Sequence, residues 1–238
     1  LPCLGSFVGS DILAGILATR MHLTSDLNVL VDLGTNGELV VGNSERMVCT
    51  STAAGPAFEG ARIAMGMRAA TGAISEVQWD GKQVRCTVLG QGSARGICGS
   101  GLVDAAAVGL GQGVILPSGR FRDRSPWLLD GQVTLNQGDI RELQLAKGAI
   151  AAGIRLLLQA WGATVEEVRS VYLAGAFGNY INRASARRIG MLPFPEEQIE
   201  PAGNTALLGA KMMLFNEFGD GSVVEALRRR VRHLSLKE

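Results

Sequence analysis

The stretch "NVLVDLGTNGELVVG", residues 28–42, decides the fold of this chain. An apolar run leads into Asp32, a Gly-Thr-Asn-Gly turn follows, and Glu38 opens a second apolar run at Leu39–Val41. Two short apolar runs on either side of such a turn predict a β-hairpin. The hairpin would carry a carboxylate at the end of its first strand and a glycine-rich tip.

The tip has the composition of a phosphate-binding loop. Gly34 and Gly37 allow backbone N–H groups to approach a phosphate closely, and Thr35 and Asn36 add a hydroxyl and an amide as donors. Asp32 cannot bind phosphate itself, so its expected role is to hold the hydration shell of a Mg²⁺ ion or to orient an attacking water. The alternative is a plain hairpin turn, because Asn-Gly is a favoured turn dipeptide.

The bulk composition is ordinary for a compact soluble protein. Hydrophobic residues make up 47% and charged residues 19% of the 238 residues, and the formal net charge is +1. A chain of this length can bury a substantial core, and its charge balance gives no sign of a nucleic-acid or membrane-surface partner. No apolar run reaches the ~18 residues of a membrane span. We therefore expect neither nucleic acid nor a membrane among its partners.

The cysteine pattern argues against a metal centre in this chain. Cys3, Cys49, Cys86 and Cys98 lack the short C-x-x-C spacing of metal and cluster sites. Reduced, buried thiols in a cytoplasmic protein are the expectation. The N-terminus is apolar but has neither an initiator Met nor a basic region, so it does not read as a signal peptide. It reads instead like a chain cut out of something longer.

The remaining pattern predicts helices alternating with strands. Helices are expected at residues 9–21, 58–70, from about Ser100, 139–161, 183–189, 205–218 and 223–232. Strands are expected at residues 28–33, 38–42, 46–51, on both sides of Asp80-Gly81, and at 169–174, and residues 117–136 are expected to be loop-like with short strands. Asp139 is a candidate N-cap for the long helix, and Gly162 is its stop. One continuous α/β unit with an inserted segment is the economical fold.

A second glycine turn, "VYLAGAFGN" at residues 171–179, comes directly after a predicted buried strand and ahead of a helix. Gly175, Ala176 and Gly178 would let the ribose and adenine of a nucleotide approach the backbone. A strand-to-helix turn in which glycine relieves crowding is the alternative. The next helix, "GNTALLGAKMML" at residues 203–214, carries glycine and alanine at helical spacing and so has a small-residue face.

These segments, in their order and spacing, resemble the second half of the sugar kinase/DnaK-type chaperone/actin superfamily. "DLGTNGE" is similar to the second phosphate loop, "LAGAFG" to the adenosine motif, and "SDILAGILA" and "GNTALLGAKMM" to the two helices that connect the lobes. The resemblance covers nearly the whole chain. It implies an α/β fold: an actin-like (ribonuclease H-like) ATPase lobe with a mixed sheet, flanking helices and an inserted α+β subdomain at residues 71–136.

A closer resemblance is to the C-terminal region of the reductive activators of corrinoid proteins. "STAAGPAFEGARIAMGM", "GICGSGLVDA" and "DIRELQLAKGAI" carry it. Members of that family join an N-terminal [2Fe–2S] ferredoxin domain to an actin-like ATPase. The resemblance implies that residues 1–238 form the second lobe, without the first lobe and without the iron–sulfur domain. The missing N-terminal lobe is therefore an expected partner.

The resemblance also assigns roles to individual residues, with ATP or ADP and Mg²⁺ as the ligands. The expected phosphate loop comprises Asp32, Gly34, Thr35, Asn36 and Gly37. Asp32 would contact Mg²⁺ through water, and Asp11 is a candidate for positioning the attacking water. The residues expected near the ribose and adenine are Gly55, Glu59, Gly99, Ser100, Gly175, Ala176, Gly178 and Asn179. Thr35 and Asn36 stand where the chaperones have further glycines, which implies slow hydrolysis.

The activity that the resemblance implies belongs to the assembled protein. ATP would close the two lobes, and closure would drive reduction of Co(II) to Co(I) in a corrinoid protein, the second expected partner. Differential binding of ATP and of that partner to open and closed states would supply the free energy. Two alternatives stay open: the lobe of a small-molecule kinase, and a non-hydrolysing actin-like module that serves only for docking.

Overall fold

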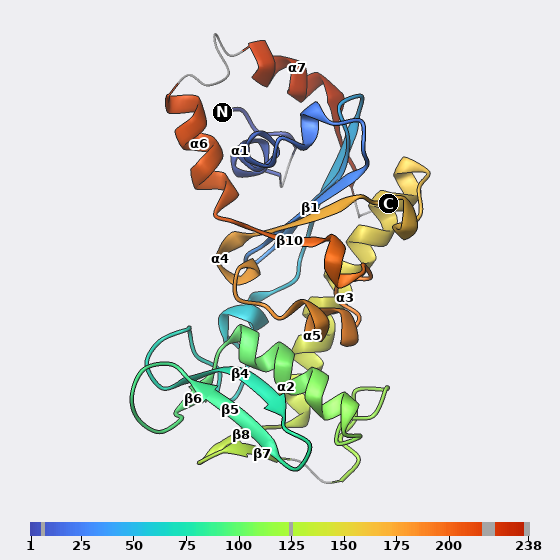
Figure 1. Cartoon of the computed structure of the whole chain (residues 1–238). Helices are drawn as coiled ribbons and strands as arrows, with labels where there is room; N and C mark the ends of the chain where they lie inside the picture. The colour runs from blue at the N-terminus through green and yellow to red at the C-terminus, as the bar shows by residue number, and fades with distance from the viewer. Residues whose placement is uncertain (6–7, 124–125, 216–221, 236–238) are drawn as a thin grey trace. The chain divides into compact units, whose positions relative to one another are not determined.

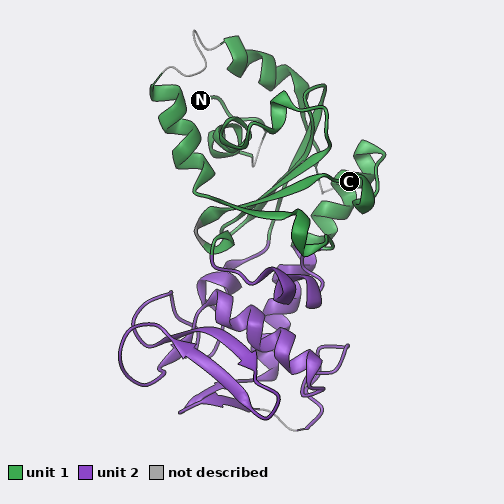
Figure 2. Ribbon diagram, in the orientation of Figure 1, with its two compact units in different colours: residues 1–53, 150–179, 193–238 green, residues 54–149, 180–192 purple. Residues whose placement is uncertain are grey.

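The computed structural model describes residues 1–5, 8–123, 126–215 and 222–235 (Figure 1). The chain divides into two compact units (Figure 2). Unit 1 comprises residues 1–53, 150–179 and 193–238, and unit 2 comprises residues 54–149 and 180–192. The segment 71–136, predicted as an inserted subdomain, falls entirely within unit 2.

Unit 1 is built on a mixed sheet. Its strands among the described residues are β1 Asn28–Leu33, β2 Gly37–Gly42, β3 Met47–Thr52, β9 Ser170–Ala174, β10 Ile199–Gly203 and β11 Val231–His233. They lie in the order β10-β9-β1-β2-β3-β11. β2 pairs antiparallel with both β1 and β3, whereas β9 pairs parallel with both β1 and β10. The carboxyl ends of β10, β9 and β1 therefore lie at the same end of the sheet.

Helices cover both faces of this sheet. The helical segments of unit 1 are α1 Ser10–Thr19, η1 Met21–Leu23, η3 Val165–Glu167, α4 Gly175–Gly178, η4 Glu196–Gln198, α6 Thr205–Leu214 and α7 Ser222–Arg230. Leu30 and Val40 join the buried cluster that α1 and α7 form on one face. The side chain of Leu39 points to the other face of the sheet, where it lies against Gly153 of α3 (Gln137–Trp161).

α1 and α6 pack side by side through the small residues noted in the sequence (Figure 1). A Cβ at Gly209 would lie 2.0 Å from the carbonyl oxygen of Ala14, and a Cβ at Gly15 would lie 3.1 Å from Thr205 Oγ1. The two backbones can approach this closely only because side chains are absent at the crossing. The small-residue face predicted for residues 203–214 is therefore confirmed as part of a helix–helix contact.

Unit 2 is an α+β arrangement. Its elements among the described residues are η2 Pro56–Glu59, β4 Ala73–Trp79, β5 Val84–Val88, β6 Gly96–Ile97, α2 Gly99–Gly111, β7 Trp127–Asp130, β8 Val133–Leu135 and α5 Arg183–Arg188. Residues of α3 up to Ala149 also belong to it. The predicted hairpin at Asp80-Gly81 is confirmed, with Gly81 in the left-handed region at φ +96°.

The helix predicted for residues 58–70 is wrong. The 3-10 turn η2 stops at Gly60, whose φ is +81°, and a Cβ at Gly66 would lie 2.0 Å from the carbonyl oxygen of Gly60. The backbone pairs with Ile97 of β6 instead: Ile97 N–H donates to Met65 O at 2.9 Å, and Met67 N–H donates to Ile97 O at 2.9 Å. Both glycines serve this tight loop, which no helix could form.

The long helix α3 begins at Gln137, two residues before the predicted start. Asn136 is its N-cap, because Asn136 Oδ1 accepts the N–H groups of Gly138 at 2.7 Å and Asp139 at 3.1 Å. Asp139 Oδ2 accepts the N–H of Asn136 at 2.8 Å in return, and its Oδ1 accepts the N–H of Ala64 at 2.7 Å. Gly162, at φ +87°, ends the helix as predicted.

Three strands were not expected from the sequence: β6, β10 and β11. β11 occupies the end of the helix predicted at residues 223–232, so α7 ends at Arg230. The helix predicted at 205–218 is confirmed as far as Leu214, and residues 216–218 lie outside the described residues.

Candidate functional site

The predicted hairpin at residues 28–42 is confirmed, and it places Asp32 at the carboxyl end of β1. Leu33 and Gly37 form the last pair of the β1–β2 ladder, which leaves Gly34, Thr35 and Asn36 as an exposed tip. A Cβ at Gly34 would have its nearest contact 3.6 Å away, at Asn36 O. The tip is therefore open to a ligand, although Gly34 N–H already donates to Asn36 O at 3.0 Å.

Gly37 has a packing role. A Cβ there would lie 2.8 Å from Thr52 Oγ1 and 3.2 Å from Ile150 Cγ1, and Thr52 Oγ1 donates to Gly37 O at 3.0 Å. Gly37 is buried. The close approach of β3 and α3 thus accounts for this glycine without a phosphate, and its contact with nucleotide stays a prediction.

The second glycine turn lies directly beside Asp32. Asp32 pairs in register with Ala174, the last residue of the parallel strand β9. A Cβ at the next residue, Gly175, would lie 2.7 Å from Asp32 Oδ1 and 2.6 Å from Leu33 O, and Gly175 has φ +87°. Two motifs that are far apart in the sequence therefore meet at the same strand ends.

The short helix α4 continues this edge. A Cβ at Gly178 would lie 3.2 Å from the carbonyl of Leu173, so α4 folds back onto β9. Asn179 is exposed, and its side-chain amide lies 3.8 Å from the place of a Cβ at Gly203, which ends β10. The backbone of Ala176 lies within α4. The ends of β1, β9 and β10 thus present Asp32, Gly175 and Gly203 in a row, and ligands of α/β proteins typically bind at such ends.

Asp32 belongs to a group of carboxylates. The pKa of Asp32 is raised to about 6, mainly by burial and additionally by the negative charge of Asp11. Asp11 lies in the first turn of α1, is exposed, and accepts the N–H of Ile12 on Oδ1 at 3.0 Å. The structure therefore brings the two predicted catalytic carboxylates into electrostatic contact, with Asp11 already engaged by its own helix.

Glu38 is a residue of this group that the sequence analysis did not single out. It pairs directly with Asp32 across the hairpin, so both side chains lie on the face that α1 covers. Burial raises the pKa of Glu38, a hydrogen bond from Ser51 opposes the shift, and the charges of Asp11 and Asp32 add to it. The sequence did indicate this pairing, because Asp32 and Glu38 are equally distant from Thr35 at the tip of the hairpin.

The remaining predicted site residues belong to unit 2. Gly55 has φ +77° with no atom within 4 Å of a Cβ there, so backbone conformation alone requires glycine. Glu59 is exposed in η2. Gly99 opens α2, and Ser100 is buried with Oγ donating to Ser75 O at 2.8 Å. Nucleotide contacts of these four residues stay predictions, and Ser100 has a structural partner of its own.

The strand-end residues suit a phosphate accompanied by a hydrated divalent cation. Mg²⁺ prefers oxygen ligands and commonly keeps several waters when it accompanies nucleotide phosphates. The carboxylates of Asp32 and Glu38 supply such oxygens beside the open tip. Within the described residues, no three His, Cys, Asp or Glu side chains are close enough to hold a metal directly. Any cation at this site would therefore complete its ligand shell with water or with phosphate oxygens.

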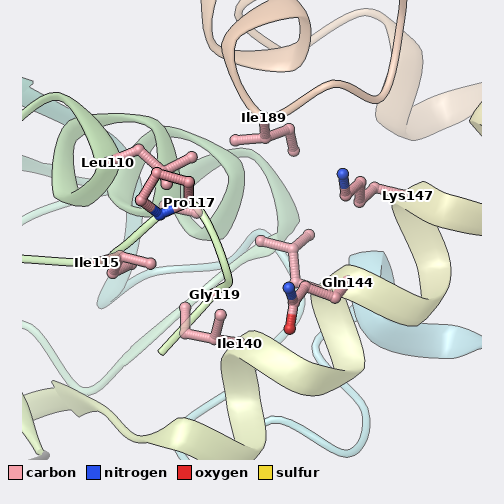
Figure 3. A pocket seen from close by; sticks show the side chains of 10 residues that line it. Leu110, Ile115, Pro117, Gly119, Ile140, Gln144, Lys147 and Ile189 are labelled. Carbon is pink, nitrogen blue, oxygen red and sulfur yellow. The ribbon is translucent and has the colours of Figure 1, made fainter. Parts of the chain in front are cut away.

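A separate hollow in unit 2 is apolar (Figure 3). It has a volume of about 60 Å³ and is bordered by residues of α2 and α3, the loop between them, and Ile189. Its apolar walls include Leu110, Ile115 and Ile140, and half-buried Lys147 lies at its rim. Unlike the strand-end site, it has no carboxylate among its lining residues.

Two structural findings limit other interpretations. Within the described residues, no helix combines the length and hydropathy that a bilayer crossing requires. Cys49 and Cys98 are buried, Cys86 is half-buried and Cys3 is exposed, and all are free thiols. Burial raises the pKa of the Cys49 thiol to about 12, so this side chain is a neutral part of the core.

Several known proteins match this chain over nearly its full length. The corrinoid activation enzyme RamQ of Eubacterium limosum is 35% identical over 99% of the chain. The [Co(II) methylated amine-specific corrinoid protein] reductase of Methanosarcina barkeri is 29% identical over 96%. A solved structure of a reductive activator for corrinoid, iron-sulfur protein matches all of the chain with a TM-score of 0.89 and 34% identity.

The chain spans less than half the length of these proteins: 44% of the first, 46% of the second and 41% of the third. The family model described as the C-terminal domain of RACo, the ASKHA domain, matches residues 26–238. The mixed α/β sheet with its flanking helices agrees with that fold. The chain therefore belongs to the family of RACo C-terminal ASKHA domains.

Proposed function

We propose that this chain is the nucleotide-binding lobe of a reductive activator, which uses ATP to drive reduction of Co(II) to Co(I) in a corrinoid protein. Family membership and the names of the similar proteins support the corrinoid reaction. The observation that carries the nucleotide part is the contact between the hairpin and the second glycine turn, where Gly175 lies against Asp32. For the complete protein, we also propose a first lobe, a [2Fe–2S] domain and a location in the cytoplasm.

The residues at the strand ends divide the work of binding. The exposed tip from Gly34 to Asn36 offers N–H, hydroxyl and amide donors to the phosphates. Gly175 and Gly178 keep the backbone bare at the turn where the ribose and adenine would approach. Asp32 orients water, either in the shell of Mg²⁺ or as the attacking nucleophile. When MgATP is bound, its phosphates supply the negative charge that these groups recognise. Its binding also supplies free energy.

Coupling to the corrinoid protein requires differential binding. A ligand shifts a conformational equilibrium only by the difference between its affinities for the two states, and a shift from 1:99 to 99:1 needs about 5.5 kcal/mol. For one electron, 59 mV is equivalent to about 1.4 kcal/mol, so a shift of that size corresponds to about 240 mV of reducing potential. ATP and the corrinoid protein would therefore both bind more tightly to the closed state. The cobalt of the corrinoid protein would be reduced in that state.

One observation favours a second function, an actin-like module that binds ATP with little turnover. Asp11 is the predicted water-positioning group, yet its Oδ1 accepts the N–H of Ile12 and its side chain is short and exposed. A carboxylate held in this way is poorly placed to activate water. ATP would then act through binding and release, with slow hydrolysis resetting the protein.

Calorimetric titration of the complete protein with MgATP and MgADP tests the proposal. We expect binding in the wild type, at least about a tenfold weaker binding in Asp32→Asn, and unchanged binding in Asp26→Asn. Asp26 is an exposed carboxylate just before the other end of β1 and serves as the matched control. Failure of the complete protein to bind either nucleotide would overturn the ATP-binding proposal.

Absorbance of the corrinoid protein tests the second half of the proposal. With a low-potential electron donor present, the Co(I) band should appear when the complete protein and MgATP are added together. It should not appear with MgADP, or with Asp32→Asn and MgATP. Equal rates with and without ATP would show that the lobe does not drive the reduction.

A further inference from the structure

A second hollow in unit 2 differs from the apolar one because charged and amide side chains help to line it. It has a volume of about 360 Å³ and lies where α2 contacts β4 and α5 (Figure 1). Buried Val77 and Ala107 form apolar parts of its wall, and Trp79, which is 41% exposed, stands at its edge. All of its lining residues belong to unit 2, whereas Asp32 and Gly175 of the strand-end site belong to unit 1.

The carboxylate of Asp104 lies in the wall of this hollow and is only half satisfied. Asp104 is 3% exposed, and its Oδ2 accepts the N–H of Val77 at 3.3 Å. Its Oδ1 is buried and has no hydrogen-bond partner within the described residues. Burial raises the pKa of this carboxyl, and Ser185 and Val77 partly oppose the rise, yet neither donates to Oδ1. A buried acceptor that lacks a donor is costly, so Oδ1 calls for a donor from outside the chain.

The structural role of Asp104 does not require its negative charge. The short strand β6 pairs with only the first part of β4, and side chains of α2 satisfy the edge of β4 beyond it. Ser100 Oγ donates to Ser75 O at 2.8 Å there, and Asp104 accepts the N–H of Val77. An asparagine at this position would accept the same N–H through its amide oxygen, without a charge to desolvate. The fold therefore explains one oxygen of Asp104 and leaves the charge unexplained.

A guanidinium group lies at another part of the hollow. A Cβ on Gly111 would overlap Nη1 of Arg188, so this exposed side chain lies on the bare backbone of the last turn of α2. The partial negative charge at the C-terminus of a helix favours a cation in that place. Arg188 takes part in no ion pair or hydrogen bond within the described residues, and no cation is among the charges that act on Asp104. The two opposite charges of the hollow therefore do not neutralise each other.

The helix α2 sets the spacing between these charges. Asp104 and Gly111 both belong to α2, two helical turns apart on one face, which corresponds to about 10 Å. Ala107 and Val108 line the hollow between them, so the surface from one charge to the other is apolar. A hydrogen bond of about 2.8 Å at each end leaves roughly 5 Å, the length of a chain of about four methylene groups.

We infer that this hollow binds a small organic zwitterion, whose ammonium group contacts Asp104 and whose carboxylate contacts Arg188. The ammonium supplies the donor that Oδ1 lacks, and a guanidinium binds a carboxylate through two parallel hydrogen bonds. The alkyl chain between the two ends packs on Ala107 and beside the ring of Trp79. Because Oδ1 is buried, entry of the ammonium requires rotation of the small side chain of Ser185, which also lines the hollow.

Calorimetric titration of the complete protein with 5-aminopentanoate tests this inference. The compound carries an ammonium and a carboxylate at the two ends of a chain of four methylene groups. Pentylamine and pentanoate are the matched compounds, because each carries only one of the two charged ends. We expect 5-aminopentanoate to bind with a Kd of about 0.1–1 mM, and each of the matched compounds to bind at least about tenfold more weakly.

Three variants assign the two ends of the ligand. Asp104→Asn keeps an acceptor for Val77 N–H, and its affinity for 5-aminopentanoate should fall about tenfold, to the level of pentanoate. Arg188→Gln should lower the affinity for 5-aminopentanoate to the level of pentylamine. Arg187→Gln is the matched control, because Arg187 is an exposed neighbour on α5 outside the hollow, and it should leave the affinity unchanged.

A fourth variant blocks the hollow from an exposed position. Ala184 lines the hollow on α5 and is exposed, so Ala184→Leu places a larger side chain in it without disturbing the core and should abolish binding. This variant decides the question if Asp104→Asn fails to fold, which circular dichroism shows. As a second readout, the indole N–H resonance of Trp79, assigned with Trp79→Phe, should shift when 5-aminopentanoate binds.

The outcomes are separate from those of the nucleotide titrations. Loss of affinity in Asp104→Asn, Arg188→Gln and Ala184→Leu, with Arg187→Gln unchanged, supports the inference. No binding of 5-aminopentanoate to the folded wild type up to about 20 mM overturns it. Binding that survives in Ala184→Leu also overturns it, because the compound then binds elsewhere. Pentylamine that binds as tightly as 5-aminopentanoate contradicts the role of Arg188 and with it the zwitterion.

Discussion

Gly175 lies so close to Asp32 that a Cβ on Gly175 would be 2.7 Å from Asp32 Oδ1. The same Cβ would lie 2.6 Å from the carbonyl oxygen of Leu33, and the residue has φ +87°. The glycine is thus required both by its backbone conformation and by the neighbouring strand. This contact joins the hairpin of residues 28–42 to the turn at residues 175–179.

Gly175→Ala should therefore destabilise the protein by about 3 kcal/mol, the sum of left-handed strain and steric overlap. Gly162→Ala is a matched control, because Gly162 also has φ +87° but a Cβ there would meet nothing within 4 Å. It should cost only about 1 kcal/mol of strain. Urea unfolding of the two variants measures the difference, and equal losses would show that the contact with Asp32 has no energetic weight.

The raised pKa of Asp32 predicts a dependence of stability on pH. The pKa is 3.8 in the absence of perturbation and about 6 in the fold, so the folded state binds the proton more tightly than the unfolded state. The associated stability is fully present below about pH 4 and is lost as the pH rises through about 6. At pH 8, after a discount for partial exposure, Asp32→Asn should stabilise the protein by about 1–2 kcal/mol.

Thermal unfolding at pH 5 and pH 8 tests this expectation, with Asp26→Asn as the control for removal of a charge. The gain from Asp32→Asn should be larger at pH 8. A gain that is absent at pH 8, or equal at both values, would mean that the carboxylate is not destabilised by its surroundings.

A glycine at the crossing of α1 and α6 and a glycine in an open part of α3 should respond in opposite ways to substitution by alanine. Gly209→Ala would force a Cβ to within 2.0 Å of Ala14 O, and we expect a loss of about 2–3 kcal/mol as the helices separate. Gly148→Ala, in α3, meets no atom within 4 Å and should stabilise the protein by about 0.5–1 kcal/mol through helix propensity. Midpoints of chemical unfolding measure both, and the same sign for both would refute the packing argument.

Substitution of Ser100 can show whether its side chain stabilises the fold or contacts the nucleotide. Its hydroxyl donates to the partly buried Ser75 O at 2.8 Å, so Ser100→Ala leaves that carbonyl without this donor and should cost about 1 kcal/mol of stability. Exposed Ser118→Ala should be nearly neutral. We expect the Kd for MgATP to be unchanged in folded Ser100→Ala. A clearly weaker Kd would instead restore Ser100 to the nucleotide site.

Much of the fold could be predicted because its signals are local. The hairpins at residues 28–42 and at Asp80-Gly81 follow from turn chemistry and alternation. The failures depend on distant partners. Met65 and Met67 hydrogen-bond to the distant Ile97, and residues 231–233 form the strand β11 instead of continuing the helix because they pair with the edge of β3. No window of local sequence contains those partners.

The candidate site was predicted in part for the same reason. Asp32 and Gly175 could be recognised as separate motifs, but their contact exists only because β1 and β9 are parallel neighbours. Glu38 was not singled out, because its electrostatic interaction with Asp11 depends on how α1 packs against the hairpin. Gly37 illustrates the opposite case: a glycine typical of a phosphate loop is required by Thr52 and Ile150.

The strand order of unit 1 has a consequence for how the protein is made. β10 and β11 are the two edge strands of its sheet in the described residues, and both come from residues 193–238. While a ribosome is still adding those residues, β9 and β3 have unpaired edges, which are templates for unwanted strand pairing. Pairing over such sequence separations is also slow. A nascent chain of this protein should therefore depend on chaperones until β11 has emerged.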